Sequence, residues 1–196
     1  MNRTVSAEKQ EWRRRQRALC RGRCPEERAA LAASLGLHLG RWLEAVRPTV
    51  VLAFRPLDDE PSLPDLLERI RAGGLRAALP RVRPDGSGLD VHEMVAGSRC
   101  VAGPFGLSEP DPATCPALDP GEVAAVLVPG LAFDRTTGVR LGRGGGYYDR
   151  LLGDPRLRAV AVGVAFPWQL VDGLPVEAHD RRMDFLATPA GLEAVR

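Results

Sequence analysis

Residues 126–152 read V-L-V-P-G-L-A-F-D-R-T-T-G-V-R-L-G-R-G-G-G-Y-Y-D-R-L-L, and they decide the fold of this chain. The stretch starts inside a run rich in β-branched residues, 123–128, which predicts a buried strand ending at the Pro-Gly step that follows. Residues 140–146 then hold two arginines and four glycines, and residues 147–152 place aromatic and leucine side chains at helical spacing. Strand, glycine-rich turn and helix in this order predict an α/β unit.

The glycine-rich turn has the composition of an anion-binding loop. Glycines let successive backbone N–H groups converge on an anion, and the following helix adds its positive end. Arg140 and Arg143 can direct forked donors at phosphate oxygens. The turn is not a Walker loop, because it has no lysine, nor a G-x-G-x-x-G fingerprint, because Tyr147 stands at the third glycine. A flexible surface turn is the alternative, but the arginines, the aromatic pair and Asp149 favour phosphate binding.

Length and composition predict one ordinary globular domain spanning residues 1–196. Of the residues, 44% are hydrophobic and 27% charged, as is typical of a soluble protein. A net charge of only +2 argues against a broad nucleic-acid footprint. The basic residues are arginines with a single exception, Lys9, which makes this lysine a candidate functional residue.

The four cysteines do not form a recognisable metal motif. Cys20 and Cys24 are separated by three residues, whereas Cys100 and Cys115 lie far away and have no nearby histidine pair. They are expected to be unpaired thiols in a reducing cytosol. The polar, basic N-terminus is not followed by an apolar run, and no later segment has the length of a membrane span. We therefore expect a cytoplasmic protein.

Two helices are expected at the N-terminal end. Residues 6 to about 21 are strong helix formers, and Lys9 and Arg13, four residues apart, point from one face. For the arginine run as a whole, a solvated basic face is expected. A second helix is expected from Pro25, with Cys24 as its cap and an apolar stripe at helical period that faces the core.

A predicted strand at 49–54 leads into the acidic, proline-bounded loop R-P-L-D-D-E-P. Ligands of open α/β sheets bind at the carboxyl ends of strands, so Asp58, Asp59 and Glu60 are candidates for binding a cationic or donor-rich ligand. They are equally suited to capping the helix expected at 62–71. The sequence leaves these two alternatives open.

The second half alternates further strands with loops. The other expected strands are residues 75–79, 89–95 (a candidate antiparallel strand), 158–166 and about 183–187. Pro80 is expected to stop the first of these. The proline-rich stretch 103–121 is expected to be an irregular lid or binding loop, in which Glu109 has either a ligand or a turn role. His179 and Asp180 are expected at the surface. The alternation predicts a three-layer α/β fold, a mostly parallel sheet with helices on both faces.

Six motifs run from one end of the chain to the other. They are K-x-x-x-R at 9–13, G-P-F-G-L-S-E-P at 103–110, V-P-G-L-A-F-D at 128–134, R-L-G-R-G-G-G-Y-Y-D-R at 140–150, A-F-x-x-Q at 165–169 and L-P-V-E-A-H-D at 174–180. In this order and spacing they resemble the 5-formyltetrahydrofolate cyclo-ligase family, also called 5,10-methenyltetrahydrofolate synthetases. The motif at 140–150 is the most specific of them.

The resemblance implies a Rossmann-like (NagB/RpiA/CoA-transferase-like) fold and an ATP- and Mg²⁺-dependent cyclisation of 5-formyltetrahydrofolate. A formamide oxygen is a poor leaving group, so the implied role of ATP is to phosphorylate it to an iminophosphate before N10 of the folate closes the ring. Such phosphoryl transfer depends on positioning and charge rather than on a protein nucleophile. The implied partners are ATP and the folate, with or without a polyglutamate tail; no nucleic acid, no membrane and a monomeric state are expected.

The resemblance also carries residue roles. The implied nucleotide-binding residues are Lys9, Arg13, Arg140, Gly142, Arg143, Gly144, Gly145, Gly146, Tyr147 and Tyr148. The implied folate-binding residues are Arg13, Arg55, Glu60, Arg143, Gly144, Gly145, Gly146 and Tyr147. Arg143 and Tyr147 are the implied catalytic residues, and Asp149 and Asp180 the implied magnesium ligands, since paired carboxylates suit that ion.

Three positions depart from the family pattern, and two other classes of function remain as alternatives. Arg55 stands where some relatives carry an apolar residue, Arg143 where bacterial members commonly have tyrosine, and Gly145 where some have lysine. A non-catalytic folate- or nucleotide-binding regulator is the main alternative, although a pure binder has no use for a phosphoryl-transfer metal site. A sugar-phosphate isomerase or CoA-transferase would need its own base, for which Glu60 and Glu109 are the candidates.

Overall fold

The computed structural model describes residues 4–195, and its centre is an eight-stranded sheet in the order β13-β12-β10-β7-β1-β2-β3-β6. In that order the strands are Gly191–Ala194, Phe185–Thr188, Val160–Val164, Ala125–Val128, Val50–Leu52, Arg76–Val82, Leu89–Glu93 and Ala117–Leu118. Neighbouring strands from β12 to β2 are parallel, whereas β13, β3 and β6 are antiparallel at the edges. The expectation of a mostly parallel sheet is confirmed.

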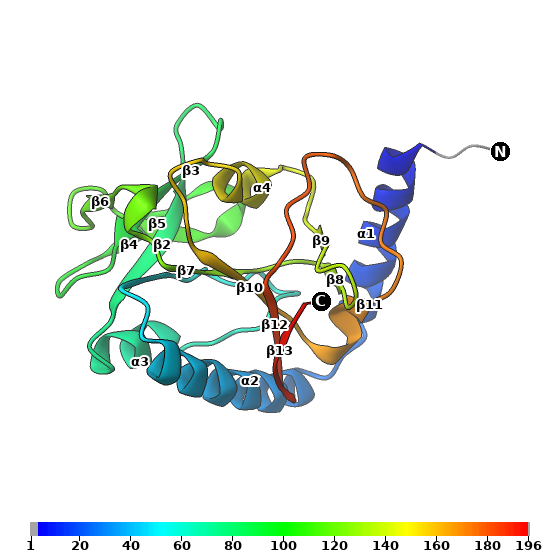
Figure 1. Cartoon of the computed structure of the whole chain (residues 1–196), viewed down its shortest axis with the longest axis horizontal. Helices are drawn as coiled ribbons and strands as arrows, with labels where there is room; N and C mark the ends of the chain where they lie inside the picture. The colour runs from blue at the N-terminus through cyan, green and yellow to red at the C-terminus, as the bar shows by residue number, and fades with distance from the viewer. Residues whose placement is uncertain (1–3, 196) are drawn as a thin grey trace.

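Helices cover both faces of this sheet, as Figure 1 shows. The α-helices of the described residues are α1 (Val5–Arg21), α2 (Pro25–Val46), α3 (Leu66–Ala72) and α4 (Tyr147–Leu152). Successive strand residues point to opposite faces. Val51 of β1 therefore packs in the cluster that contains Leu39 of α2, and Val50 packs in the cluster that contains Leu151 of α4. Because both faces are covered, β1 and β7 are apolar and buried at every position.

Short elements at the carboxyl edge of the sheet were not evident in the sequence. β8 (Ala132–Asp134), β9 (Arg140–Leu141) and β11 (Leu170–Val171) form a small sheet, and α1 packs beside it through Trp12. Asp134 fixes this corner, because its two carboxylate oxygens accept the N–H groups of Thr136, Thr137, Gly173 and Leu174. Burial opposes ionisation, but these donors hold the pKa of Asp134 below its ordinary value.

β2 does not stop at Pro80 as expected but continues to Val82. Its parallel pairing with β1 ends at Ala78, and from there β3 holds it on the other side. The N–H groups of alternate residues point to the same side, and the N–H of Val82 points to Glu109 (3.2 Å) rather than to β3. Pro80 lacks its N–H on this open side, so the strand continues without losing a ladder bond.

The expectations were also too coarse in three other places. The stretch 103–121 is not wholly irregular, since it contains β5 (Ser108–Pro110), which pairs with β4 (Cys100–Ala102), and β6 of the main sheet. Glu109 is buried in β5 and not in a turn. The helix expected at 62–71 is α3, which begins only at Leu66. The strand expected at about 183–187 is β12, which forms a hairpin with a further strand, β13. Single 3₁₀ turns occur at η1 (Pro104–Gly106), η2 (Pro120–Glu122) and η3 (Pro167–Gln169).

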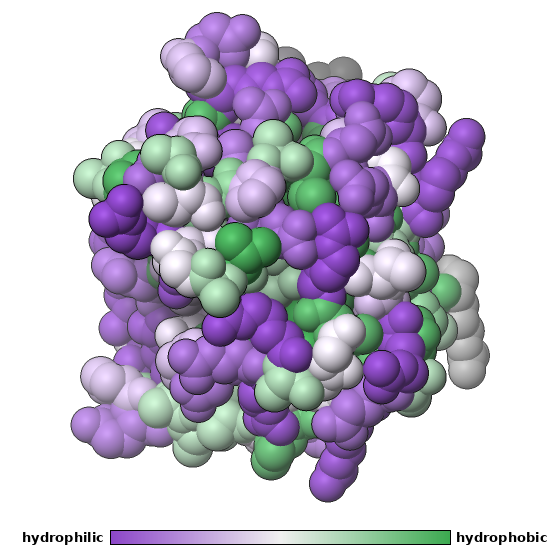
Figure 2. Space-filling model, turned by 90° about the vertical axis from the view of Figure 1, so that its left-hand side faces the viewer, coloured by the Kyte–Doolittle hydropathy of each residue, from purple (hydrophilic) through white to green (hydrophobic). Residues whose placement is uncertain are grey.

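A membrane span and an exposed sheet edge place different requirements on the helices and the surface of a protein. Between residues 4 and 195, no helix combines the length and the apolar character that a membrane span requires. Figure 2 shows hydrophilic residues over most of the face that includes the β6 edge, with hydrophobic residues in small separate groups. A polar face of this kind protects an exposed sheet edge from pairing with another chain.

All four cysteines are free thiols.

The close packing of β10 predicts the effect of adding one methyl group. A Cβ on Gly163 would lie 2.7 Å from Cε1 of Phe133 and 2.9 Å from Cδ2 of Leu186, both of which are buried. Gly163→Ala is therefore expected to lower the free energy of unfolding by about 1–3 kcal/mol in urea denaturation. Gly36→Ala is the matched control, because its Cβ would meet only Leu63 at 3.6 Å. In the interior of α2 this change is expected to stabilise by up to about 1 kcal/mol. Wild-type stability of Gly163→Ala would refute this packing argument.

Candidate active site

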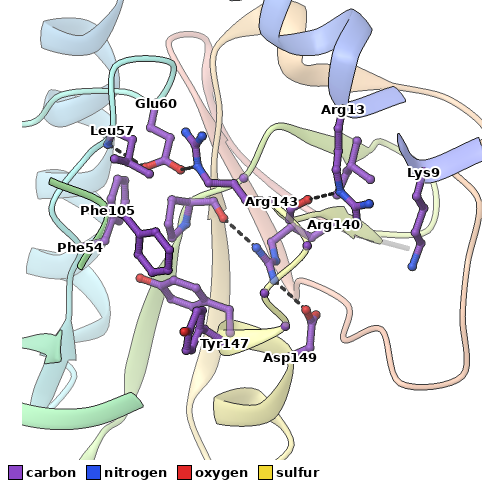
Figure 3. Close-up of a pocket in the computed structure, with 18 of the residues that line it drawn as sticks. Lys9, Arg13, Phe54, Leu57, Glu60, Phe105, Arg140, Arg143, Tyr147 and Asp149 are labelled. Carbon is purple, nitrogen blue, oxygen red and sulfur yellow. Dashed lines mark hydrogen bonds and ion pairs between the residues drawn. The ribbon is translucent and has the colours of Figure 1, made fainter. Parts of the chain in front are cut away.

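The carboxyl ends of β1 and β7 are neighbours, and the loops that follow them open into one cavity of about 1340 Å³. Elements far apart in the sequence complete its walls, namely α1, the glycine-rich loop and residues 177–180. Of the three candidate acids after β1, only Glu60 lines it, and Asp58 and Asp59 do not. Every residue to which the family resemblance assigned a role lines it: Lys9, Arg13, Arg55, Glu60, Arg140, Gly142, Arg143, Gly144, Gly145, Gly146, Tyr147, Tyr148, Asp149 and Asp180. Figure 3 shows ten of the lining residues with labels.

The cavity has a basic end and an apolar end. Lys9 and Arg13 mark the basic end in Figure 3, and Phe54, Phe105 and Tyr147 lie together on the opposite side. Tyr147 and Phe105 meet edge to face with ring centroids 6.1 Å apart. Phe105 lies in the quoted 103–110 motif, but no role was assigned to it. A site with these two ends suits a polyanion together with a flat heterocycle.

The glycine-rich loop needs its glycines for two separate reasons. Gly144 and Gly146 have φ values of 112° and 66°, a region that side chains rarely adopt. At Gly142 a Cβ would come within 2.8 Å of a guanidinium nitrogen of Arg140. The helix that follows, α4, has only six residues, so the end of a helix contributes less here than the sequence suggested. Loop amides and guanidinium groups are therefore the main candidate donors for an anion here.

Arg140 is the buried cation at the base of this loop. Its Nη1 donates to the carbonyl of Pro129 (3.2 Å) and its Nη2 to Oδ2 of Asp149 (2.9 Å), while its Nε has no partner among the described residues. The guanidinium carbon lies 5.4 Å from the ring centroid of Tyr148, which is itself buried. Burial, and then the charge of Glu60, raise the pKa of the Tyr148 phenol. Arg140 thus fixes the orientation of Asp149.

Arg143 crosses from the glycine-rich loop to the acidic loop after β1. Its Nε lies 3.3 Å from Oε1 of Glu60, and its Nη2 pairs with Asp59. The second carboxylate oxygen of Glu60 accepts the N–H of Leu57 at 2.9 Å, as Figure 3 shows. The alternative that these acids cap the next helix is wrong, because α3 begins after Asp65. The acidic loop instead faces the cavity.

Burial changes the acid–base behaviour of both partners in this ion pair. Burial raises the pKa of Glu60 to about 7, against the opposing effects of the Leu57 N–H and the charge of Arg140. Burial, and then repulsion by Arg17, lower the pKa of Arg143. Glu60 is therefore a carboxyl group that changes protonation near neutral pH.

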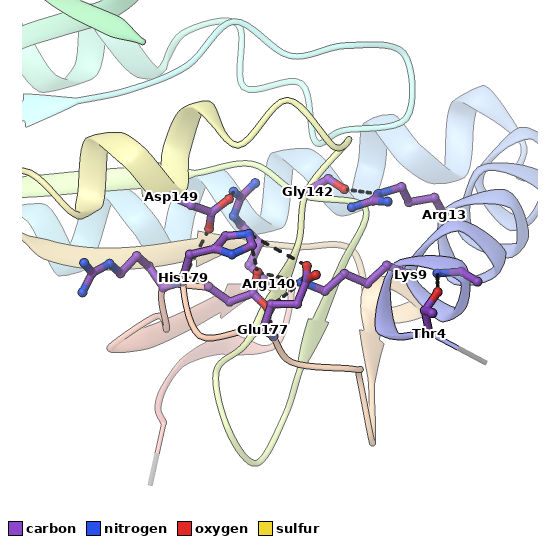
Figure 4. Close-up of polar contacts among 11 residues, drawn as sticks. Thr4, Lys9, Arg13, Arg140, Gly142, Asp149, Glu177 and His179 are labelled. Carbon is purple, nitrogen blue, oxygen red and sulfur yellow. Dashed lines mark hydrogen bonds and ion pairs between the residues drawn. The ribbon is translucent and has the colours of Figure 1, made fainter. Parts of the chain in front are cut away.

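Lys9 reaches from α1 into a pair of carboxylates. Its Nζ lies 2.7 Å from Oε2 of Glu177 and 2.6 Å from Oδ2 of Asp180. Figure 4 shows this cluster beside Arg13, whose Nε donates to the carbonyl of Gly142 at 2.9 Å. The expectation that residues 179–180 lie at the surface is wrong for Asp180, whose side chain is only 6% exposed. Glu177 was not singled out by the sequence, although it lies in one of the quoted motifs.

The donor set near Lys9 fits a hard cation such as Mg²⁺. Ligand atoms of Glu177, His179 and Asp180 all lie within 4.8 Å of one another. Asp149 is not part of this group, but it lines the same cavity, and its Oδ1 has only a long contact, 3.5 Å, with the N–H of residue 181. Carboxylate oxygens are the ligands that Mg²⁺ prefers. The residues present therefore fit the ion.

Two further predicted positions differ from the simple expectation. Arg55 is exposed at the cavity rim, and its closest polar contact is with the thiol of Cys100 at 3.8 Å. The basic run of α1 is not a wholly solvated face, since Arg17 and Arg21 line the cavity together with Lys9. The spacing of these residues at four-residue intervals was visible in the sequence, but the surface that they face was not.

Comparisons with known proteins agree with one another. Residues 5–189 match the model of the 5-formyltetrahydrofolate cyclo-ligase family. The 5-formyltetrahydrofolate cyclo-ligase of Mycolicibacterium smegmatis is 38% identical over 161 residues, which are 79% of this chain and 82% of that protein. The Escherichia coli K12 enzyme of the same name is 30% identical over 183 residues, 91% and 96% of the two chains.

Solved structures show the same relationship. The NMR structure of Aquifex aeolicus 5,10-methenyltetrahydrofolate synthetase has a TM-score of 0.82 and 29% identity, covering 96% of this chain and 93% of that one. A 5,10-methenyltetrahydrofolate synthetase from Mycoplasma pneumoniae has a TM-score of 0.75, with 92% and 98% of the chains covered. At 20% identity the latter supports the fold alone.

The raised pKa of Glu60 predicts a pH-dependent stability. The folded state binds this proton more tightly than the unfolded chain, whose ordinary value is 4.5, so the stability from protonated Glu60 is lost as the pH rises towards 7. Relative to Glu60→Gln, which does not titrate, the wild type is expected to lose on the order of 2 kcal/mol of unfolding free energy over this range. Urea denaturation at a series of pH values tests this. Parallel curves for the two proteins would show that Glu60 has an ordinary pKa.

Proposed function

This chain belongs to the 5-formyltetrahydrofolate cyclo-ligase family, and we propose that it converts 5-formyltetrahydrofolate and ATP into 5,10-methenyltetrahydrofolate, ADP and phosphate. The observation that carries the proposal is the single cavity with a cationic, glycine-rich end and an apolar end that holds a buried carboxyl group. These two ends match the triphosphate and the pterin ring. Because they share one cavity, the formyl group and the γ-phosphate can meet.

The chemistry needs ATP because the formamide oxygen must become a leaving group. Transfer of the γ-phosphoryl group to that oxygen gives an iminophosphate and ADP. N10 of the folate then attacks the formyl carbon, phosphate departs with the oxygen, and the N10 proton is lost to solvent. Holding the reactants together and stabilising charge are sufficient for these steps, so the site requires no protein nucleophile.

The cationic residues are the proposed contacts of the triphosphate. Lys9, Arg13 and Arg140 line the cavity together with residues 142–146 of the glycine-rich loop, whose N–H groups are further candidate donors. Arg140 is held by Pro129 and Asp149, so it presents a fixed charge. Arg13 has its Nε on a carbonyl and no carboxylate partner among the described residues, so its charge is available to a phosphate.

Asp149 and Asp180 are the proposed magnesium ligands. When bound, the ion would neutralise charge on the phosphates. Lys9 orients the carboxylate of Asp180 by pairing with it, and Oδ2 of Asp180 also accepts the N–H of Glu177 at 2.7 Å. Arg140 orients the carboxylate of Asp149 from the other side. Each ligand is thus held by a partner of its own.

The folate is proposed to bind at the apolar end. Glu60 would accept N–H groups of the pterin, and the ring of Tyr147, already in contact with Phe105, would pack on the ligand. Arg143 connects the two ends, because it extends from the loop that meets the phosphates to the carboxyl group that meets the pterin. We therefore place Arg143 and Tyr147 at the reacting groups, and Arg55 at the rim that the folate passes.

The proposed reaction has a direct optical test. Purified protein is mixed with Mg-ATP and 5-formyltetrahydrofolate, and the absorbance band of methenyltetrahydrofolate is followed, with a control that omits ATP. The band is expected to appear only with ATP. A folded protein that binds ATP or folate without producing the band would support the regulatory alternative instead.

The proposed metal site predicts a loss of turnover in a protein that still folds, although removing the charged partner of buried Arg140 also lowers its stability. Asp149→Asn keeps the size of the side chain but removes the charge, and is expected to lower kcat by about 100-fold or more. The control is Asp154→Asn, an acid a few residues further on that pairs with Arg156 outside the cavity. Thermal unfolding of both variants checks the fold. If Asp149→Asn retained the wild-type kcat, Asp149 would not be a magnesium ligand.

A further inference from the structure

α1 presents a row of cations to the cavity that is longer than the proposed reaction needs. Lys9, Arg13, Arg17 and Arg21 follow one another at four-residue intervals, and all of them line the cavity. Four residues advance an α-helix by about 6 Å, so the row extends over about 18 Å. Gln16 and Cys20 are buried beside this row, on the face that also carries Lys9, and they hold the helix in place.

The first half of this row already has partners, whereas the second half does not. Lys9 is paired with Glu177 and Asp180, and Arg13 donates to the glycine-rich loop. Arg17 and Arg21, by contrast, have no hydrogen bond and no salt bridge among the described residues. Arg17 even adds to the positive charge around Arg143. Like charges gathered without counter-ions at a cavity wall favour an anionic ligand.

The unpaired half lies towards the acidic loop and away from the candidate metal ligands. The indole Nε1 of Trp168 donates to the sulfur of Cys20 in the last turn of α1 at 3.3 Å. The neighbouring Gln169 donates to the carbonyl of Asp59 at 3.3 Å. These contacts join the C-terminal end of α1 to the loop that carries Glu60. An anion at Arg17 and Arg21 would therefore lie near the proposed pterin position.

We infer that Arg17 and Arg21 form a subsite for the carboxylates of the glutamate tail of the folate. The inference rests on the proposed function, in which the phosphates use Lys9, Arg13 and Arg140, and the pterin uses Glu60. The part of the substrate that remains is its glutamate, which carries two carboxylates, and each further γ-linked glutamate adds one more. The first glutamate binds beside Arg17, and further ones extend along α1 towards Arg21.

Arginine suits this task because its guanidinium offers paired donors to a carboxylate. Arg17 is half-buried and Arg21 is exposed, so water screens the charge of Arg17 less, and a carboxylate is attracted more strongly to Arg17 than to Arg21. Added salt screens exposed charges, and the preference for longer tails should therefore weaken as salt is added.

The test compares three substrates that differ only in the tail: 5-formyltetrahydropteroate without glutamate, the monoglutamate and the triglutamate. In the double variant Arg17→Gln/Arg21→Gln, the KM for the triglutamate is expected to rise about tenfold or more, with a smaller rise for the monoglutamate. The KM values for the pteroate and for Mg-ATP are expected to stay within about twofold of wild type. Arg15→Gln is the control, since Arg15 lies on the same helix, outside the cavity, over the ring of Trp12.

The possible outcomes separate this inference from the proposed function. Equal KM changes for all three folates, a raised KM for Mg-ATP, or no change at all would each overturn the subsite. Turnover of the pteroate by the wild type tests the reaction without the tail. If the wild type turned over none of the three substrates, the proposed function would fall, and the subsite with it.

Discussion

The parallel pairing of β1 with β7 is the constraint on which the rest of the structure depends. Val51 lies opposite Ala125 and Leu52 opposite Val126, so the loops after both strands leave the sheet at the same edge. One loop brings the acids at 59–60 and the other leads to the glycine-rich turn. The pairing is stable because both strands are apolar on both faces and covered on both sides.

The site built on this edge is a balance of charges that come from distant parts of the chain. Burying a charge is costly unless a partner compensates it, and removing one partner of a buried pair leaves the other uncompensated. Lys9, Arg140 and Arg143 are compensated in this way by acids on other elements. Asp149 is a proposed metal ligand, Glu60 is a proposed contact of the pterin, and Glu177 lies beside the proposed metal ligand Asp180. Ligand binding must therefore change these ion pairs. Arg17 and Arg21 have no such acidic partner among the described residues, and their uncompensated charge is what indicates a further anionic ligand.

The sequence predicted those features that depend on local patterns. The buried run at 123–128 and the glycines at 142–146 were sufficient to predict a strand and, after it, a glycine-rich loop at the edge of the sheet. Features that depend on distant partners were not predictable: Glu177 meets Lys9 across 168 residues, and Asp134 holds an N–H group 39 residues away. The same limit explains the error at Pro80, since its tolerance depends on where β1 ends. The direction in which the basic face of α1 points also follows only from packing.

The central claim is that the chain activates the formyl oxygen of its substrate by phosphoryl transfer within a single cavity. Its most direct test uses 5-formyltetrahydrofolate with ¹⁸O in the formyl group, turned over with Mg-ATP, followed by mass analysis of the inorganic phosphate. The account predicts that the label appears in the phosphate, one ¹⁸O for each ring closed. Unlabelled phosphate, with the label released to water, would mean that the formyl oxygen was never phosphorylated and would contradict the account.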